Sequence, residues 1–266
     1  MTEVKKVLTI AGSDPSGGAG IQADIKTITV HGMYAMSVIT SLTAQNTTGV
    51  FGVQDTPPEF VKKQLDCVLS DIRPDAVKIG MVSSAAIVRA IAGKLKEHSV
   101  KRIVLDPVMV STSGSRLLAA DAVEALRTEL FPLADLLTPN LPEAQCLCGR
   151  EIKTAGEMEV AANEIAGALR GGVLIKGGHL TDTADDLLFT NGEYTWFHSQ
   201  RVQNPNTHGT GCTLSSAIAC NLAAGYSLKE SVQKAKDYLT GALKAGLDLG
   251  AGSGPLYHAY GIGKKA

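Results

Sequence analysis

The sequence has no excess of charge of either sign. Its 266 residues carry 25 basic and 26 acidic side chains, for a formal charge of −1 at pH 7. Nucleic-acid binding relies on a large basic surface, so this balance argues against that class of protein. Cysteine is also scarce: there are five, an odd number, with no C-x-x-C pair. That pattern argues against a disulfide framework and is typical of a reducing compartment.

Long apolar runs are absent as well. The first apolar stretch, residues 7–11, meets a glycine loop at once and is too short for the core of a signal peptide. No other run approaches the roughly 20 apolar residues that a membrane-spanning helix needs. Repeats and low-complexity linkers are missing too. We therefore expect one domain over residues 1–266, located in the cytoplasm, with no nucleic-acid or membrane partner.

Two common nucleotide-binding motifs are missing. The Walker pattern G-x-x-x-x-G-K-[ST] occurs nowhere in the chain. Residues 18–23 match the dinucleotide pattern G-x-G-x-x-A, but no Asp or Glu lies between Asp24 and Asp55 to hold a ribose. These absences argue against P-loop proteins and NAD-dependent dehydrogenases. Two interpretations of the loop at residues 12–20 remain: a ligand-binding loop, or a turn at a helix start that requires small residues.

What the sequence has instead is glycine, 28 copies in clusters, and an alternation of short apolar runs with helix-period segments. This alternation predicts an α/β fold with a mostly parallel central sheet and helices on both faces. Two further runs, residues 187–189 and 194–198, flank Asn191-Gly192, which favours a type I′ turn and predicts a small antiparallel edge hairpin. The expected strands are residues 6–11, 37–44, 76–79, 102–105, 135–137 and 173–175. The expected helices are residues 19–31, 58–70, 85–98, 120–130, 141–148, 154–169, 211–224 and 228–249, the last with Ser227 as its N-cap and Glu230 three residues on.

Glycine or a polar residue with useful chemistry follows nearly every expected strand. In an open parallel sheet, the carboxyl ends of the strands form the rim of the ligand crevice. We therefore expect these residues to meet at one rim, although each loop alone would be weak evidence. In chain order they are Gly12-Ser13-Asp14, Gln45-Asn46, Gly80-Met81, Asp106-Pro107, Thr138-Pro139-Asn140 and Lys176-Gly177-Gly178-His179.

A second glycine loop, residues 206–212, opens an apolar helix rich in small residues. Backbone N–H groups at such a helix start can converge on an anion, and the helix dipole adds partial positive charge. Cys212 would lie in the first turn, where the pKa of a thiol falls. The alternative is a small cysteine buried at a helix start.

Seven motifs together carry a resemblance: residues 12–24, 44–47, 78–81, 106–109, 138–144, 176–179 and 206–212. In this order they resemble the hydroxymethylpyrimidine kinase/phosphomethylpyrimidine kinase family of the ribokinase-like superfamily. The resemblance implies a ribokinase-like fold and phosphorylation, dependent on ATP and Mg²⁺, of 4-amino-5-hydroxymethyl-2-methylpyrimidine. A second phosphorylation would convert the monophosphate to the diphosphate in thiamin biosynthesis. Relatives also suggest a homodimer.

The resemblance implies roles for residues in each motif. The catalytic group comprises Cys212 with the amides of Gly209, Thr210 and Gly211. The residues implied to contact phosphate or ATP are Lys176, Asn140 and Thr210, and those implied to hold the metal are Asp106 and Glu143. The pyrimidine site would be formed by Gln45, Gly12, Asp24, Met81 and Val108.

Structural alternatives stand beside several of these roles. Lys176 could be a surface lysine at a strand end. Asn140 and Glu143 have the spacing of a helix capping box, which is compatible with metal binding. Met81 and Val108 are equally well explained as core residues.

Cys212 stands where the wider superfamily has an aspartate, and the resembled branch also uses cysteine there. A neutral thiol cannot accept a proton, so we expect Cys212 to act as a thiolate whose pKa the loop amides depress. Three other cysteines, Cys67, Cys146 and Cys148, lack histidines at metal-ligand spacing and are predicted to be buried helix residues. His179 and His208 lie in relevant loops, but a lone histidine is more often simply hydrogen-bonded.

Two rival functions remain. Pyridoxal kinases of the same branch have nearly identical motifs, and some carry a second cysteine after the Asp-Pro-Val-Met-Val segment. Here residues 111–115 contain no cysteine, which argues against that two-cysteine mechanism. A nonenzymatic nucleotide-binding module would share the fold but should have lost the phosphate-handling groups, which this chain keeps together.

Overall fold

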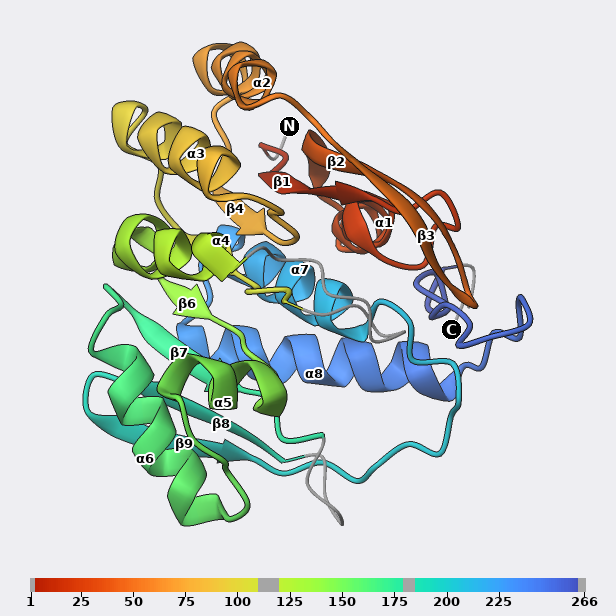
Figure 1. Ribbon diagram of the computed structural model, residues 1–266. Coiled ribbons are helices and arrows are strands. Elements are labelled where there is room, and N and C mark those ends of the chain that lie inside the picture. Colours follow the sequence, from red (N-terminus) through yellow and green to blue (C-terminus); the bar gives the residue numbers. More distant parts are fainter. Residues whose placement is uncertain (1–2, 110–119, 179–184, 263–266) are drawn as a thin grey trace.

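The computed structural model describes residues 3–109, 120–178 and 185–262, and a nine-stranded mixed sheet crosses this part of the chain (Figure 1). The strand order is β3-β2-β1-β4-β5-β6-β7-β8-β9. All neighbours from β2 to β7 are parallel, whereas β3, β8 and β9 pair antiparallel. The bounds are β1 Lys6–Ser13, β2 Tyr34–Asn46, β3 Gly49–Asp55, β4 Ala76–Ile79, β5 Ile103–Leu105, β6 Leu136–Leu137, β7 Gly172–Ile175, β8 Asp186–Thr190 and β9 Glu193–Phe197.

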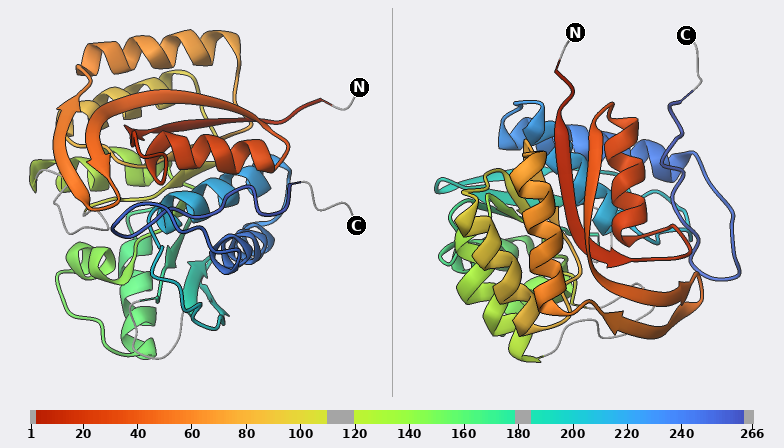
Figure 2. Two further views of the ribbon diagram at one scale, coloured as in Figure 1. Left: turned by 90° about the vertical axis from the view of Figure 1, so that its right-hand side faces the viewer. Right: turned by 90° about the horizontal axis from the view of Figure 1, so that it is seen from above.

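Helices cover both faces of the sheet, as predicted (Figure 2). One face packs against α2 (Pro58–Asp71), α3 (Ala85–Glu97), α4 (Ala120–Ala125), α5 (Leu141–Cys148) and α6 (Ala155–Ala166). The other face packs against α1 (Gly20–Val30), α7 (Thr210–Ala223) and α8 (Leu228–Lys244). Each face has its own apolar cluster, because successive side chains of a strand point to opposite faces. The central strands β4, β5 and β7 are accordingly buried along their whole length.

The edge formed by β2 and β3 differs from the prediction. β2 is longer than the expected residues 37–44, and β3 was not predicted at all. Two glycines interrupt β3, and most of its residues are exposed, so it lacks the alternation that marks a half-buried strand. A register shift between Ala44 and Gln45 indicates a bulge there. Bulges redirect side chains near functional sites, and this one lies at Gln45.

The hairpin at the opposite edge agrees with the prediction. Asn191 and Gly192 have φ values of 52° and 80° between β8 and β9. A type I′ turn requires positive φ at both central residues, which explains the Asn-Gly pair.

The helix starts follow local capping chemistry. Ser227 with Glu230, Thr154 with Glu157, and Asn140 with Glu143 each form a complete capping box. Helix ends were predicted less well: the segment expected at 120–130 becomes π-helical after α4, and α8 ends at Lys244 rather than at residue 249. No helix among the described residues is both long and apolar enough to cross a membrane.

The prediction for three cysteines was wrong. Cys67 and Cys146 are exposed on the outer sides of α2 and α5, whereas Cys148 is only partly buried, packed against the apolar cluster of its sheet face.

Candidate active site

The first turn of α7 lies directly on a charged pair at the carboxyl ends of two strands. Asp106 follows β5 and Lys176 follows β7, and their side chains form an ion pair with a distance of 3.0 Å between Oδ1 and Nζ. A Cβ placed on Gly211 would lie 3.3 Å from Asp106 Oδ2 and 3.4 Å from Lys176 Nζ. Glycine at this position therefore lets the backbone of the helix start approach both charges.

The helix-opening loop presents amide groups to this region. The Thr210 N–H donates to the Thr207 carbonyl, and the first bond back from α7 runs from the Thr213 N–H to the Gly209 carbonyl. Among the described residues this leaves the Gly209, Gly211 and Cys212 amides as the helix-opening donors for an external acceptor. Of the predicted amides Gly209, Thr210 and Gly211, the Thr210 amide is thus engaged within the loop, whereas those of Gly209 and Gly211 remain open.

Two glycine loops pack closely together here. Gly209 has a φ of +85°, and a Cβ on it would lie 1.9 Å from the Gly18 carbonyl oxygen. Only glycine allows both this left-handed conformation and this close contact. The loop before α1 and the loop before α7, nearly 200 residues apart in sequence, therefore form one surface.

Glu143 and Asn140 extend the charged pair. Glu143 is buried, and its two carboxylate oxygens accept from the Met109 N–H at 3.2 Å and the Asn140 N–H at 2.8 Å. Burial raises the pKa of Glu143, although the charge of Lys176 opposes the rise. Burial lowers the pKa of Lys176, but the charges of Asp106 and Glu143 outweigh it, so the net pKa is raised. The capping role of Glu143 and its nearness to the charged centre coexist, as the sequence left open.

The predicted pyrimidine contacts lie on the other side of the loop. Gln45 Nε2 is 3.5 Å from Nε2 of His208, the residue just before Gly209. A Cβ on Gly12 would lie 3.1 Å from Met81 Sδ, so these two residues are also neighbours. Val108 is half-buried beside Asp106. The predicted His179 and the segment 111–115 lie outside the described residues.

Comparison with known proteins decides the family. A family model described as phosphomethylpyrimidine kinase matches residues 14–257, most of the chain. This chain belongs to the phosphomethylpyrimidine kinase family. The predicted relationship is confirmed.

Individual relatives agree with the family. The chain is 46% identical over 258 residues to the hydroxymethylpyrimidine/phosphomethylpyrimidine kinase of Streptomyces coelicolor, covering 97% of this chain and 96% of that protein. It is 50% identical over 253 residues to the thiamine biosynthesis bifunctional protein ThiED of Geobacter sulfurreducens, covering 95% of this chain and 52% of the relative. The chain therefore spans about half the length of the bifunctional relative.

Solved structures confirm the predicted ribokinase-like fold. The phosphomethylpyrimidine kinase of Clostridium difficile gives a TM-score of 0.80 at 47% identity, covering 89% of this chain and 98% of that one. The pyridoxal kinase of Staphylococcus aureus in complex with AMP-PCP and pyridoxal gives 0.90 at 34% identity, covering 99% and 96%. These proteins are kinases, and so is this chain.

A second ion pair, between Lys78 and Asp24, lies beneath the active site of this phosphomethylpyrimidine kinase family member. Both side chains are fully buried, and Lys78 Nζ is 3.0 and 2.8 Å from the two carboxylate oxygens. Asp24 also accepts from the Thr9 hydroxyl at 2.6 Å and from the Ser216 hydroxyl of α7 at 2.7 Å. Its oxygens are thus occupied by protein groups, and Asp24 has no exposed surface for the predicted pyrimidine contact. Lys78 belongs to the 78–81 motif, but no role was predicted for it, although a lysine inside an apolar strand was a signal.

The thiol of Cys212 does not have the predicted low pKa. Burial raises its pKa to about 11. The charge of Lys78 lowers the pKa, but Asp24 and Asp106 raise it. The helix-start effect is therefore overcome by desolvation and by two nearby carboxylates.

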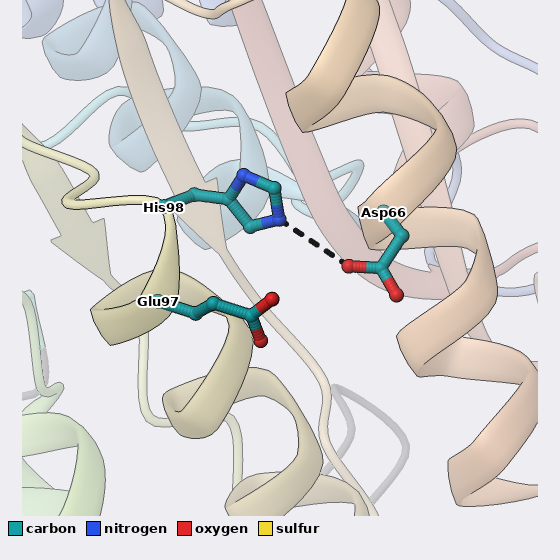
Figure 3. A group of neighbouring side chains, drawn as sticks. All are labelled: Asp66, Glu97 and His98. Carbon is teal, nitrogen blue, oxygen red and sulfur yellow. Dashed lines mark hydrogen bonds and ion pairs between the residues drawn. The ribbon is translucent and has the colours of Figure 1, made fainter.

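Among the described residues, another cluster of potential metal ligands lies between α2 and the C-terminal end of α3. Figure 3 shows the side chains of Asp66, Glu97 and His98, with His98 Nε2 3.3 Å from Asp66. Lys94 Nζ forms ion pairs with both carboxylates, at 2.8 Å to Asp66 and 2.9 Å to Glu97. The lysine already supplies the positive charge that a metal would bring, so this cluster is an exposed ion-pair network.

Proposed function

We propose that this protein transfers a phosphoryl group from ATP to 4-amino-5-hydroxymethyl-2-methylpyrimidine and then phosphorylates the monophosphate, in thiamin biosynthesis. The names of the relatives support this substrate, and the AMP-PCP complex of the pyridoxal kinase supports ATP. The observation that carries the proposal is the position of the α7 start. The first turn of α7 lies on the Asp106–Lys176 pair. Gln45 lies 3.5 Å from His208, the residue just before the N-cap of that helix.

The protein residues would act mainly by position and charge. Phosphoryl transfer has a loose transition state, with charge spread over the moving group. The Gly211 and Cys212 amides are proposed to donate to that group, aided by the positive end of α7. Lys176 would add a point charge, and Asn140 and the Thr210 hydroxyl would contact the phosphates of ATP.

Asp106 and Glu143 are the residues that would hold Mg²⁺. Magnesium prefers oxygen ligands and commonly combines one or two carboxylates with waters and substrate phosphates. Among the described residues, Asp106 Oδ2 has a single polar contact, 3.5 Å from the Ser215 hydroxyl, and each Glu143 oxygen accepts one amide, so lone pairs remain on both side chains. The donor set therefore fits the ion, which when bound would neutralise charge on the phosphates.

The pyrimidine is proposed to bind at Gln45, between Met81 and Val108. A carboxamide offers a donor and an acceptor side by side, which complements the ring nitrogen and exocyclic amine of an aminopyrimidine. Apolar side chains at Met81 and Val108 are typical walls of such a site. Cys212 would act on the hydroxyl as a thiolate, a minor form at neutral pH but a strong base.

The direct test measures ATP-dependent phosphorylation of the pyrimidine, of its monophosphate and of pyridoxal. Gln45→Ala should raise KM for the pyrimidine roughly tenfold or more, because a paired contact is lost, and should leave KM for ATP unchanged. Gln233→Ala, on the exposed side of α8, is the matched control and should behave as wild type. Equal loss of both affinities in Gln45→Ala would contradict the assignment, and no turnover of either pyrimidine would contradict the function.

Pyridoxal kinase activity is the second candidate. The pyridoxal kinase of Staphylococcus aureus has the same fold over nearly the whole chain at 34% identity, which favours some overlap. The same assay distinguishes the two functions. A kcat/KM for pyridoxal above that for the pyrimidine would make pyridoxal kinase the main activity. The alternative of a nonenzymatic nucleotide-binding module is excluded, because the chain belongs to a kinase family.

We also propose that the single kinase domain works in the cytoplasm as a homodimer formed through the β2–β3 edge. Leu42, Phe51 and Val53 expose 51%, 72% and 46% of their surface there, and apolar exposure of this kind is typical of an interface. Sedimentation should give a dimer that Phe51→Glu dissociates. A wild-type monomer would contradict this proposal.

A further inference from the structure

The carboxamide of Gln45 lies between two groups that constrain its orientation. On one side Thr43 Oγ1 lies 3.2 Å from the carboxamide atom placed as Oε1, and on the other His208 Nε2 lies 3.5 Å from the atom placed as Nε2. The two ends of a carboxamide have the same shape, so the surrounding donors and acceptors decide which end is oxygen.

His208 can only donate at this position. Its Nε2 lies 2.8 Å from Asp14 Oδ2. Asp14 is ionised: burial alone would raise its pKa, but hydrogen bonds from His208, Ser16 and Ala19 lower it to about 2. A carboxylate only accepts hydrogen bonds, so His208 Nε2 carries the hydrogen. An N–H cannot accept from a second N–H, and the group of Gln45 that faces it must be the oxygen.

Thr43 leads to the same conclusion from the other side. Its Oγ1 lies 2.9 Å from the Ser13 carbonyl oxygen, closer than it lies to Gln45. A hydroxyl has a single hydrogen, and the Ser13 carbonyl, which can only accept, takes it. Thr43 Oγ1 is then an acceptor toward Gln45, which calls for the amide nitrogen at that end.

The surroundings hold the His208 ring in place. His208 is buried, and its backbone N–H donates to the Gly254 carbonyl at 3.2 Å. A Cβ on Gly18 would lie 2.3 Å from His208 Cδ2, so the ring packs directly on the backbone of the first glycine loop. Asp14 is fixed in turn by the amides of Gly18 and Ala19, which donate to Oδ2 at 3.2 and 2.8 Å.

We propose that the Asp14–His208 pair fixes the Gln45 carboxamide with its oxygen toward His208, and that this makes the enzyme select 4-aminopyrimidines over 4-oxopyrimidines. The proposal rests on the proposed function, since it takes Gln45 as the pyrimidine contact. His208 is here a positioning residue that acts through Gln45.

The selectivity follows from the order of donors and acceptors. With its sides held by His208 and Thr43, the outer edge of the carboxamide offers oxygen and one N–H in a fixed order. An aminopyrimidine matches with its amine and its unprotonated ring nitrogen. A 4-oxopyrimidine offers a carbonyl and a ring N–H, the reverse order, so Gln45 would have to rotate. Rotation would set its amide N–H against the His208 N–H, which already donates to Asp14, and would leave that amide N–H without an acceptor.

The experiment compares kcat/KM for 4-amino-5-hydroxymethyl-2-methylpyrimidine and for its 4-oxo analogue. We expect wild type to prefer the amino substrate, and His208→Phe to reduce that preference roughly tenfold or more, with KM for ATP unchanged. His208→Gln, which can still donate an N–H, should retain part of the preference. It also provides a second readout if His208→Phe fails to fold.

His198→Phe is the matched control. His198 also pairs with an aspartate, at 2.9 Å from Asp185, but it is exposed at the end of β9. This variant should keep the wild-type preference. Equal loss of kcat/KM for both pyrimidines in His208→Phe, or a wild type without preference, would overturn the proposal and leave the kinase function intact. Absence of turnover with either pyrimidine in wild type would instead overturn the function.

Discussion

At the residue scale, the buried Lys78–Asp24 pair joins the sheet to α7, the helix whose first-turn amides are proposed to bind phosphate. Lys78 belongs to β4, Asp24 to α1, and Ser216 to α7, so one carboxylate connects three elements. The pKa of Lys78 is raised, because the charge of Asp24 outweighs the effect of burial. Lys78 is therefore charged inside the protein.

We expect Lys78→Met to destabilise the fold by about 3–5 kcal/mol, since it leaves the Asp24 carboxylate buried without its partner. The double variant Lys78→Met/Asp24→Leu should recover much of the loss, because apolar replacement of both partners is often tolerated. Urea unfolding measures both. Lys96→Met, which removes a half-exposed pair with Glu129, is the control and should change stability by about 1 kcal/mol or less. A loss no larger in Lys78→Met than in the control would contradict this account.

Cys212 gives a second prediction at this scale. Because its pKa is raised to about 11, the thiol is protonated at pH 7, and the thiolate that reacts with iodoacetamide increases about tenfold per pH unit. Alkylation followed by mass spectrometry should therefore show the Cys212 rate still rising above pH 9, with the exposed Cys67 as internal reference. A rate that levels off below pH 8 would instead support the low pKa expected from the helix start.

The sequence anticipated single residues unevenly. Asp106, Lys176 and Gly211 could be placed together because strand ends and helix starts share one rim of a parallel sheet. The pKa of Cys212 could not be foreseen, since it depends on burial and on carboxylates more than 100 residues away. Likewise, nothing in the local pattern pairs His208 with Asp14.

At the scale of elements, the parallel strands and most helices were predictable because their apolar period is strong. Strand β3 was not predictable, because an exposed edge strand has no buried face and therefore no alternation of apolar and polar residues. The conformation of the loop before α7 could not be predicted either, because it depends on its contact with the glycine loop before α1.

Gly209→Ala tests that contact. The new Cβ would meet the Gly18 carbonyl in a residue with φ of +85°, so the loop and the first turn of α7 must move. We expect kcat to fall about 100-fold or more, as when an oxyanion-hole donor is lost. Gly225→Ala at the other end of α7 is the matched control, since its φ of +94° is similar but nothing lies within 4 Å. It should cost about 1 kcal/mol of stability and leave kcat unchanged. Similar activity loss in both would show that backbone strain alone, and not the loop contact, is responsible.

At the scale of the whole molecule, the sheet order brings the two halves of the site together from opposite ends of the chain. The alternation predicted the layers, but it could not predict that the segment after α8 returns to the site. The glycines clustered at residues 246–254 predict no more than a terminal loop there. In the structure the Gly254 N–H donates to Asn206 Oδ1 at 2.9 Å and His258 Nε2 lies 3.0 Å from the Thr213 hydroxyl, so it packs along the anion loop and α7.

The same segment also touches the end of β2, where Gln45 lies. The Gly252 N–H donates to Thr47 Oγ1 at 3.2 Å, and a Cβ on Gly252 would lie 2.1 Å from the Thr47 carbonyl oxygen. Residues 252–258 thus connect the pyrimidine side of the site with the phosphate side. If this connection sets the distance between the two substrates, its displacement should impair catalysis more than folding.

Gly252→Ala displaces the segment at an exposed position, so we expect stability to change by about 1 kcal/mol or less while kcat/KM for the pyrimidine falls roughly tenfold. Gly261→Ala is the control: it lies further along the same segment with nothing within 4 Å of its added Cβ, and should match wild type in both measurements. Steady-state kinetics and urea unfolding on the two variants decide the matter. Wild-type kcat/KM in Gly252→Ala would mean that the anion loop and β2 keep their spacing without this segment, and the role assigned to it would then be wrong.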